Sequence, residues 1–158
     1  IGRAKEDLDR AASLINTRLS SLGGTAKVAV MKGLLTSASS AIPGMALYLS
    51  LLFKAMKQAG SHEGCIEQTT RLFSSELFGE GNMVTDDAGR IRMDRWELKA
   101  DTQAYVTSNW SRVTDSNLKE LTDFAGYQNA FLQLHGFGFP DIDYAEEVSP
   151  SMEMKLVD

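Results

Sequence analysis

The sequence of 158 residues contains one cysteine, three prolines and no long hydrophobic run. A single cysteine, Cys65, cannot form an intramolecular disulfide, which suits a reducing compartment. The most apolar stretch, residues 42–53, is interrupted by Pro43, Gly44 and Ser50 and is shorter than the roughly 20 residues that cross a bilayer. We therefore expect a cytoplasmic protein that does not associate with membranes.

The sequence also lacks an initiator methionine, a secretory leader and a basic stripe. Its formal net charge is -5, with acidic and basic residues interspersed, so nucleic acid is not an expected partner. The charged fraction of 23% and the hydrophobic fraction of 43% are typical of an ordered domain. We expect Ile1 to be a cut end, with the natural N-terminal part of the protein lying upstream.

Residues 1–22 predict an amphipathic helix, because apolar side chains recur at steps of four and three. These apolar positions are Leu8, Ala12, Ile15, Leu19 and Leu22. The helix should end at Gly23 and Gly24, where positive φ angles cost little. No N-cap residue precedes it, so we expect the natural helix to begin before this chain does.

Residues 27–31 form a short, β-branched apolar run after the glycine pair, which predicts a buried strand. A lone strand cannot satisfy its own backbone donors and acceptors, and no second run of this kind occurs. We therefore expect its partner strands to lie outside the chain. The predicted fold is the C-terminal part of a Rossmann-type, doubly wound α/β protein, with the chain itself mostly helical.

The remaining pattern predicts four more helices and a small β-hairpin. Helical periodicity runs over 36–59, with a break at Pro43 and Gly44, and over 63–78. A hairpin is expected around the turn 86–89. Two pairs that resemble capping boxes, Asp94 with Glu97 and Asn117 with Glu120, predict helices to about Trp110 and His135. The tail from Gly136 should be irregular.

The segment 32–37 follows the predicted strand, and ligands of doubly wound sheets bind at the carboxyl ends of the strands. Free backbone N–H groups beside the hydroxyls of Thr36 and Ser37 would suit a pyrophosphate. Taken alone, these residues are better explained by an ordinary helix cap. His62 and Cys65 alone are too few ligands for a zinc site, and Cys65 has no visible base that would make it a nucleophile.

Several ungeneric blocks resemble one known family over nearly the whole chain. They are IGRAKEDLDRAA at 1–12, KVAVMK at 27–32, TSASSAIP at 36–43 and HEGC at 62–65, followed by shorter blocks at 94–98, 120–123 and 136–138. The sequence resembles the trans-2-enoyl-CoA reductases and the bacterial enoyl-ACP reductases of the same type, which are large relatives of the short-chain dehydrogenases.

The resemblance implies an oxidoreductase of fatty acid biosynthesis that uses NADH to reduce the trans-2 double bond of an acyl thioester. A Tyr-x8-Lys pair does the chemistry in this family, and Lys5 matches the lysine, whereas the tyrosine would lie upstream of Ile1. Lys5 would bind the cofactor ribose and lower the pKa of that tyrosine. Without the family, Lys5 would be an ordinary exposed lysine on a charged helix.

The resemblance also implies further contacts. Leu34, Leu35, Thr36 and Ser37 would bind NADH, with Thr36 near its pyrophosphate. Ile42, Met45 and Leu49 would line an acyl slot, although plain core packing is the better explanation for any one of them taken singly. The glycine-rich phosphate loop belongs upstream, so the chain alone should be inactive and should not hold NADH.

We expect residues 1–60 to be the last units of the NAD-binding core, including a substrate-binding helix, and 61–158 to be a helical extension packed on it. The expected partners are an acyl-CoA or acyl-ACP substrate and the N-terminal half of the same protein, and the intact enzyme should be monomeric. No metal is expected. The alternative is a non-catalytic helical domain whose amphipathic faces bind a protein partner.

Overall fold

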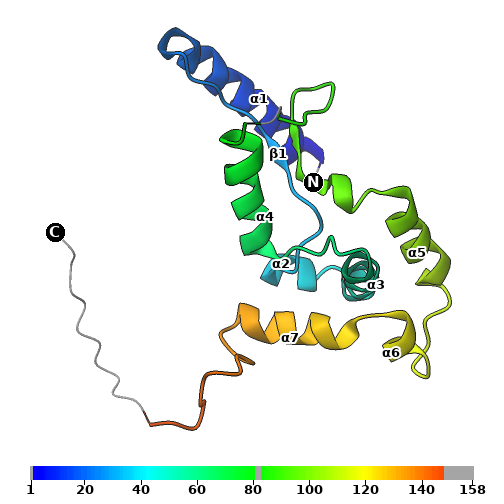
Figure 1. Cartoon of the computed structure of the whole chain (residues 1–158). Coiled ribbons are helices and arrows are strands. Elements are labelled where there is room, and N and C mark those ends of the chain that lie inside the picture. Colours follow the sequence, from blue (N-terminus) through cyan, green and yellow to red (C-terminus); the bar gives the residue numbers. More distant parts are fainter. Residues whose placement is uncertain (1, 81–82, 148–158) are drawn as a thin grey trace.

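The computed structural model describes residues 2–80 and 83–147, which form a mostly helical structure (Figure 1). Its helices are α1 (Gly2–Leu19), α2 (Ser37–Ser40), α3 (Met45–Gln58), α4 (Cys65–Arg71), α5 (Ala100–Trp110), α6 (Leu118–Leu121) and α7 (Phe124–Leu134). Single turns of 3-10 helix occupy Ser20–Leu22 and Met93–Trp96, and a π-helical segment, Leu72–Leu77, continues α4. Ile1 and the tail beyond residue 147 lie outside the described residues. None of the described helices is long and apolar enough to cross a bilayer.

Helix α3 is the centre of the core. Leu49, Leu51, Leu52 and Met56 are completely buried in it, because α3 is apolar around most of its circumference. Helices α5 and α7 pack against it and contribute Val106 and Tyr127 to the same cluster. The predicted helix over 36–59 is confirmed with its break, since α2 and α3 are separated by Pro43 and by Gly44 at φ 78°.

Helix α1 extends away from this helical cluster (Figure 1). The predicted helix is confirmed over the described residues from Gly2, and it continues through the 3-10 turn Ser20–Leu22 to Gly23 with φ 70°. None of its residues is buried, however: Leu8 and Ile15 are 55% and 50% exposed, and Leu22 in the following 3-10 turn is 81% exposed. The apolar face that the sequence pattern predicts is therefore present but uncovered in the described part of the chain.

The two strands form a small parallel sheet. In it β1 (Ala29–Val30) pairs with β2 (Ile91–Arg92), with Ala29 opposite Ile91. The prediction that all partners of the first strand lie outside the chain is wrong for this edge. Strand β2 is only two residues long and ends in an arginine, so it does not form an apolar run that sequence reading would detect.

The predicted hairpin is present around residues 86–89. Thr85 forms an antiparallel bridge with Ile91, and the Gly89 N–H donates to the carbonyl of Asp86 at 2.8 Å. The second arm of this hairpin is β2, which pairs with β1 on its other side. One local hairpin thus attaches the C-terminal half of the chain to the predicted core strand.

The two predicted capping boxes are wrong. The Asp94 carboxylate pairs with Arg92 at 2.5 Å instead of capping a helix, and α5 begins only after Lys99. The expected helix from Asn117 breaks at Thr122, and α7 has its own cap at Asp123, whose carboxylate accepts from the Gly126 N–H at 3.1 Å. In both places a contact with a residue nearby in the sequence is present where the pattern predicts the cap.

Candidate functional site

Lys5 lies on α1 at the end of the helix that faces the end of β1. Two hollows between α1 and the strand show this order. One is lined by Asp9, Ala12, Ser13 and Asn16 together with residues 26–28, and the other by Lys5, Leu8 and Asp9 together with residues 28–31. The helix and the strand are therefore antiparallel, and Lys5 lies beside the carboxyl end of β1, where ligands bind in doubly wound folds.

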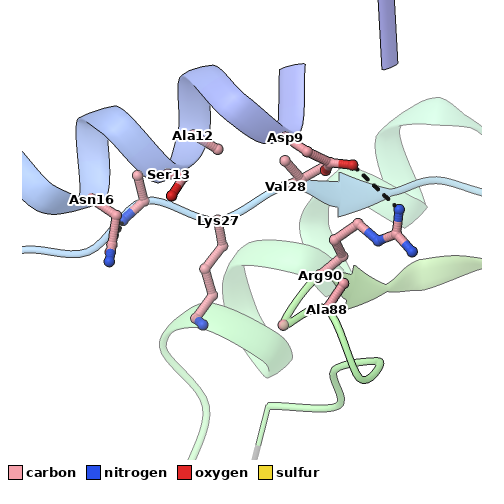
Figure 2. A pocket seen from close by; sticks show the side chains of 10 residues that line it. Asp9, Ala12, Ser13, Asn16, Lys27, Val28, Ala88 and Arg90 are labelled. Atoms are coloured by element: carbon pink, nitrogen blue, oxygen red, sulfur yellow. Dashed lines mark hydrogen bonds and ion pairs between the residues drawn. The ribbon is translucent and has the colours of Figure 1, made fainter. Parts of the chain in front are cut away.

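An ion pair fixes α1 to the hairpin. The Arg90 guanidinium reaches from the start of β2 to Asp9 on α1 at 3.4 Å, as the dashed line in Figure 2 shows. The same side chain also pairs with Asp86 across the turn at 2.9 Å. The carboxylate of Asp86 has a lowered pKa, chiefly because it accepts from the backbone N–H of Arg90. The pair of Asp9 and Arg90 thus connects α1 to the hairpin.

The loop after β1 ends in a helix cap. The Thr36 hydroxyl accepts from the Ser39 N–H at 3.0 Å, and the Ser39 hydroxyl accepts from the Thr36 N–H at 2.7 Å. Thr36 is exposed and keeps its own hydroxyl hydrogen available. The N–H groups of Leu34 and Leu35 have no acceptor among the residues that the structure describes. The cap and a cofactor contact are thus compatible at Thr36.

Two buried side chains hold the start of this loop from the opposite side. The Gln68 carbonyl oxygen accepts from the Lys32 N–H at 2.9 Å, and the Glu97 carboxylate accepts from the Gly33 N–H at 2.5 Å. Gln68 is fully buried and Glu97 is 7% exposed. Sequence reasoning missed both residues, and it read Glu97 as part of a helix cap.

Lys32 is buried although it carries an ammonium group. Its side chain is directed back to the Gly33 carbonyl at 3.1 Å. Burial lowers the pKa of Lys32, and the carboxylates of Glu97 and Glu63 partly oppose this effect. The backbone N–H groups of Lys32 and Gly33 are therefore both hydrogen-bonded, and the Lys32 side chain is hydrogen-bonded as well.

Tyr48 of α3 binds the carboxylate of Glu97. Its hydroxyl donates to the second oxygen of Glu97, and Gln103 of α5 donates to the Glu97 carbonyl at 2.8 Å. Burial and the hydrogen bond to Glu97 raise the pKa of Tyr48 to about 12. Glu97 thus joins the loop after β1 to the central helix.

A second buried polar cluster joins α4 to the segment around Met93. The Arg71 guanidinium binds both oxygens of Glu63, at 2.6 and 2.8 Å, and donates to the Met93 carbonyl at 3.0 Å. It also lies over the ring of Trp96, 4.1 Å from the centroid. Glu76 binds Arg95 at 2.5 Å. This cluster fixes α4 and its π-helical continuation against the segment that carries Glu97.

The predicted acyl-slot residues have different environments. Ile42 is 48% exposed and Met45 is half-buried, whereas Leu49 is fully buried in the core cluster, where packing alone accounts for it. An apolar hollow of about 590 Å³ lies between α3 and α7. It is lined by Ser40, Ala46, Phe124, Tyr127, Gln128, Phe131 and Leu132. The helical spacing of the aromatic residues Phe124, Tyr127 and Phe131 is the signal in the sequence that could have indicated this hollow.

Two family models match the chain. The model for the trans-2-enoyl-CoA reductase catalytic region matches residues 1–78, and the model for the enoyl reductase FAD binding domain matches residues 85–148. The chain belongs to the trans-2-enoyl-CoA reductase family. The resemblance noted in the sequence is thereby confirmed.

Individual proteins that are similar to the chain are also named as enoyl reductases. An enoyl-[acyl-carrier-protein] reductase [NADH] of Tolumonas auensis is 53% identical over 99% of the chain. The trans-2-enoyl-CoA reductases of Clostridium acetobutulicum, in complex with NADH, and of Treponema denticola, in complex with NAD, are 43% and 46% identical. They superpose with TM-scores of 0.88 and 0.84 over 94% and 93% of the chain.

The chain spans only 39% of the length of the Tolumonas relative, and 38% and 37% of the two crystallised chains. The predicted fold class is confirmed, since the chain combines a mostly helical structure and one parallel strand pair with structural neighbours of this reductase family.

The residues matched by the second model do not fit a flavin dinucleotide, despite its name. Phosphate groups of such cofactors bind at glycine-rich turns that open a helix. In residues 85–147, α5 follows Lys99, and the N-terminus of α7 is already occupied by the Asp123 carboxylate. Gly136 and Gly138 follow the end of α7 and open no helix.

Proposed function

We propose that this chain supplies the last core strand, the catalytic lysine and the C-terminal extension of an NADH-dependent reductase. The enzyme would reduce the trans-2 double bond of a fatty acyl thioester in fatty acid biosynthesis. Family membership and the names of the relatives support this activity. Because the chain spans about two fifths of these relatives, the activity belongs to the complete enzyme.

The observation that carries the proposal is the position of Lys5. The hollow that Lys5 lines is bounded by residues 28–31, and the next residues in the chain are the loop to Thr36. A lysine on the helix before the strand thus lies at the edge of the sheet where the loop that leads to Thr36 begins. This edge is where a dinucleotide would bind.

When bound, NADH supplies the hydride that adds to the β-carbon of the thioester. The ammonium of Lys5 would hold the cofactor ribose and, with a tyrosine upstream of Ile1, would stabilise the negative charge that develops on the thioester oxygen. Thr36 and Ser37 would donate to the pyrophosphate. The free N–H groups of Leu34 and Leu35 would meet the carboxamide of the nicotinamide.

The acyl chain would lie along the start of α3. Exposed Ile42 and half-buried Met45 border the loop to α2, and the apolar hollow between α3 and α7 offers an unbranched chain a place to lie. Leu49 would support this wall from within the core. We propose residues 1–60 as the end of the cofactor-binding core and 61–158 as an extension that packs on it.

The acyl carrier can be CoA or acyl carrier protein, since relatives named for either are similar to this chain. We further propose that the complete enzyme is a monomer that works in the cytoplasm, and that its other partner is the N-terminal half of the same protein. The alternative of a non-catalytic helical interaction domain is not favoured, because both halves of the chain match reductase models.

Replacing Lys5 in the complete reductase tests the proposal. Lys5→Ala should lower kcat for NADH oxidation with crotonyl-CoA by at least about 100-fold, because the charge beside the reacting oxygen is lost. Lys119→Ala, which removes an exposed lysine on α6, is the matched control and should retain full activity. Unchanged turnover in Lys5→Ala would remove Lys5 from the mechanism.

A further inference from the structure

We propose that Glu97 is a positioning residue that sets the geometry of the NADH-binding loop and couples it to the helix that borders the acyl slot. The inference rests on the proposed function and concerns a residue outside the family's Tyr-x8-Lys pair. It begins with the two oxygens of one buried carboxylate, which bind two different elements.

The first oxygen binds the loop. Gly33 directly precedes Leu34 in the loop that follows β1, and its N–H donates to Glu97 at 2.5 Å. A charge-assisted bond of this kind is roughly twice as strong as a neutral one. Because the adjacent N–H of Lys32 is held by Gln68, the two residues at the start of the loop are both fixed from the side of the extension. The following N–H groups of Leu34 and Leu35 are left free for a ligand.

The second oxygen binds α3. It accepts from the hydroxyl of Tyr48, one turn after Met45. A displacement of the loop at Gly33 would therefore pull on the same carboxylate that holds the substrate-side helix. The Glu97 backbone carbonyl is itself held by Gln103 of α5, which reduces the freedom of the carboxylate to move with either partner.

The close approach of loop and carboxylate depends on the absence of a side chain at residue 33. A Cβ atom there would lie 3.2 Å from the Glu97 oxygen that binds Tyr48, and 3.5 Å from both Leu49 and Tyr48. The glycine thus permits the contact, and a methyl group would push the carboxylate away. This gives the proposal a test that does not depend on removing Glu97.

The steady-state kinetics of the complete reductase, with NADH and crotonyl-CoA, provide the first measurement. Glu97→Ala should raise KM for NADH about tenfold and change kcat less than about threefold, because it loosens the loop without touching the reacting atoms. Glu97→Gln can still accept from Gly33 and contact Tyr48, so its KM should stay within about threefold. Glu120→Ala removes an exposed glutamate with no side-chain partner in the described residues and is the control.

A double-mutant cycle provides the second measurement. Gly33→Ala should also raise KM for NADH several-fold. Combined with Glu97→Ala, it should add little, since the carboxylate with which the methyl group collides is then gone. NADH titration followed by fluorescence gives the dissociation constant of each variant without turnover.

Additive effects in this cycle, or an unchanged NADH affinity in Glu97→Ala alongside reduced thermal stability, would overturn the inference. If Glu97→Ala does not fold, the comparison of Glu97→Gln with Gly33→Ala decides, and equal NADH affinity in these two variants would overturn it as well. A wild-type enzyme that does not oxidise NADH with crotonyl-CoA would instead refute the proposed function.

Discussion

The buried pair of Arg71 and Glu63 offers a demanding test of how α4 is held against the segment around Met93. Arg71→Ala removes two bonds to Glu63, one bond to the Met93 carbonyl and the contact with the ring of Trp96. The side chain of Glu63 is only 9% exposed, and no other partner for it is present among the described residues. The variant therefore leaves a carboxylate both buried and unpaired.

Breaking a buried ion pair on one side costs about 3–5 kcal/mol of unfolding free energy, since the remaining charge keeps its desolvation penalty. The matched control is Arg10→Ala. Its ion pair with Asp7 has a similar distance of 2.6 Å, but both side chains are 64% exposed. An exposed pair contributes about 0.2–1 kcal/mol, so the control should lose little.

Urea unfolding of the protein, followed by tryptophan fluorescence and circular dichroism, measures both variants. With a typical denaturant slope of about 1–3 kcal/mol per molar, Arg71→Ala should lower the midpoint by roughly 1 M or more. The double variant Glu63→Ala with Arg71→Ala should lose less than the sum of the single variants. A loss below about 1 kcal/mol in Arg71→Ala, or strict additivity, would refute the assignment of this pair as a buried support.

Two further predictions concern the cofactor loop and pH. In the complete reductase, Thr36→Val should raise KM for NADH about tenfold, because one hydrogen bond to a charged group is lost. Thr36→Ser keeps the hydroxyl and should retain near wild-type affinity. Equal KM values for the two variants would speak against a role of the hydroxyl. Burial, with the nearby charges of Lys32 and Lys57, lowers the pKa of His62 from 6.5 to about 4. Between about pH 6.5 and 4, His62 therefore binds a proton in the unfolded chain but not in the folded protein. The free energy of unfolding is not reduced by His62 above about pH 6.5, and it falls as the pH drops toward 4. His62→Gln should lose this part of the pH dependence, and identical urea midpoints of both proteins from pH 4 to 7 would contradict it.

Local pattern was enough to predict the long elements. The apolar spacing in α1, the break at Pro43 and Gly44, and the turn at 86–89 all follow from interactions within a few residues, and all three are present. The pairing of β1 with β2 was not predictable, because a two-residue strand carries almost no pattern and its partner lies some sixty positions away.

Glu97 shows why the candidate site was only partly predictable. An acidic residue three positions after Asp94 satisfies the spacing of a capping box, yet its carboxylate accepts from Gly33, which lies far away in the sequence. Gln68 and Glu63 likewise read as surface residues of a helix, and burial becomes evident only once α4 packs near β1. Sequence indicated the loop 32–37 itself, whereas the side chains that hold it come from tertiary contacts.

The hairpin around residues 86–89 has a consequence for assembly. The outer edge of a sheet presents unpaired N–H and C=O groups and can template the addition of another chain. On β2 the N–H of Ile91 points to β1, while the N–H of Arg92 is taken by the carbonyl of Val84 in the neighbouring arm. The arm of the hairpin that carries Val84 thus covers the outer edge of β2, so that this edge is not open to pairing with another chain.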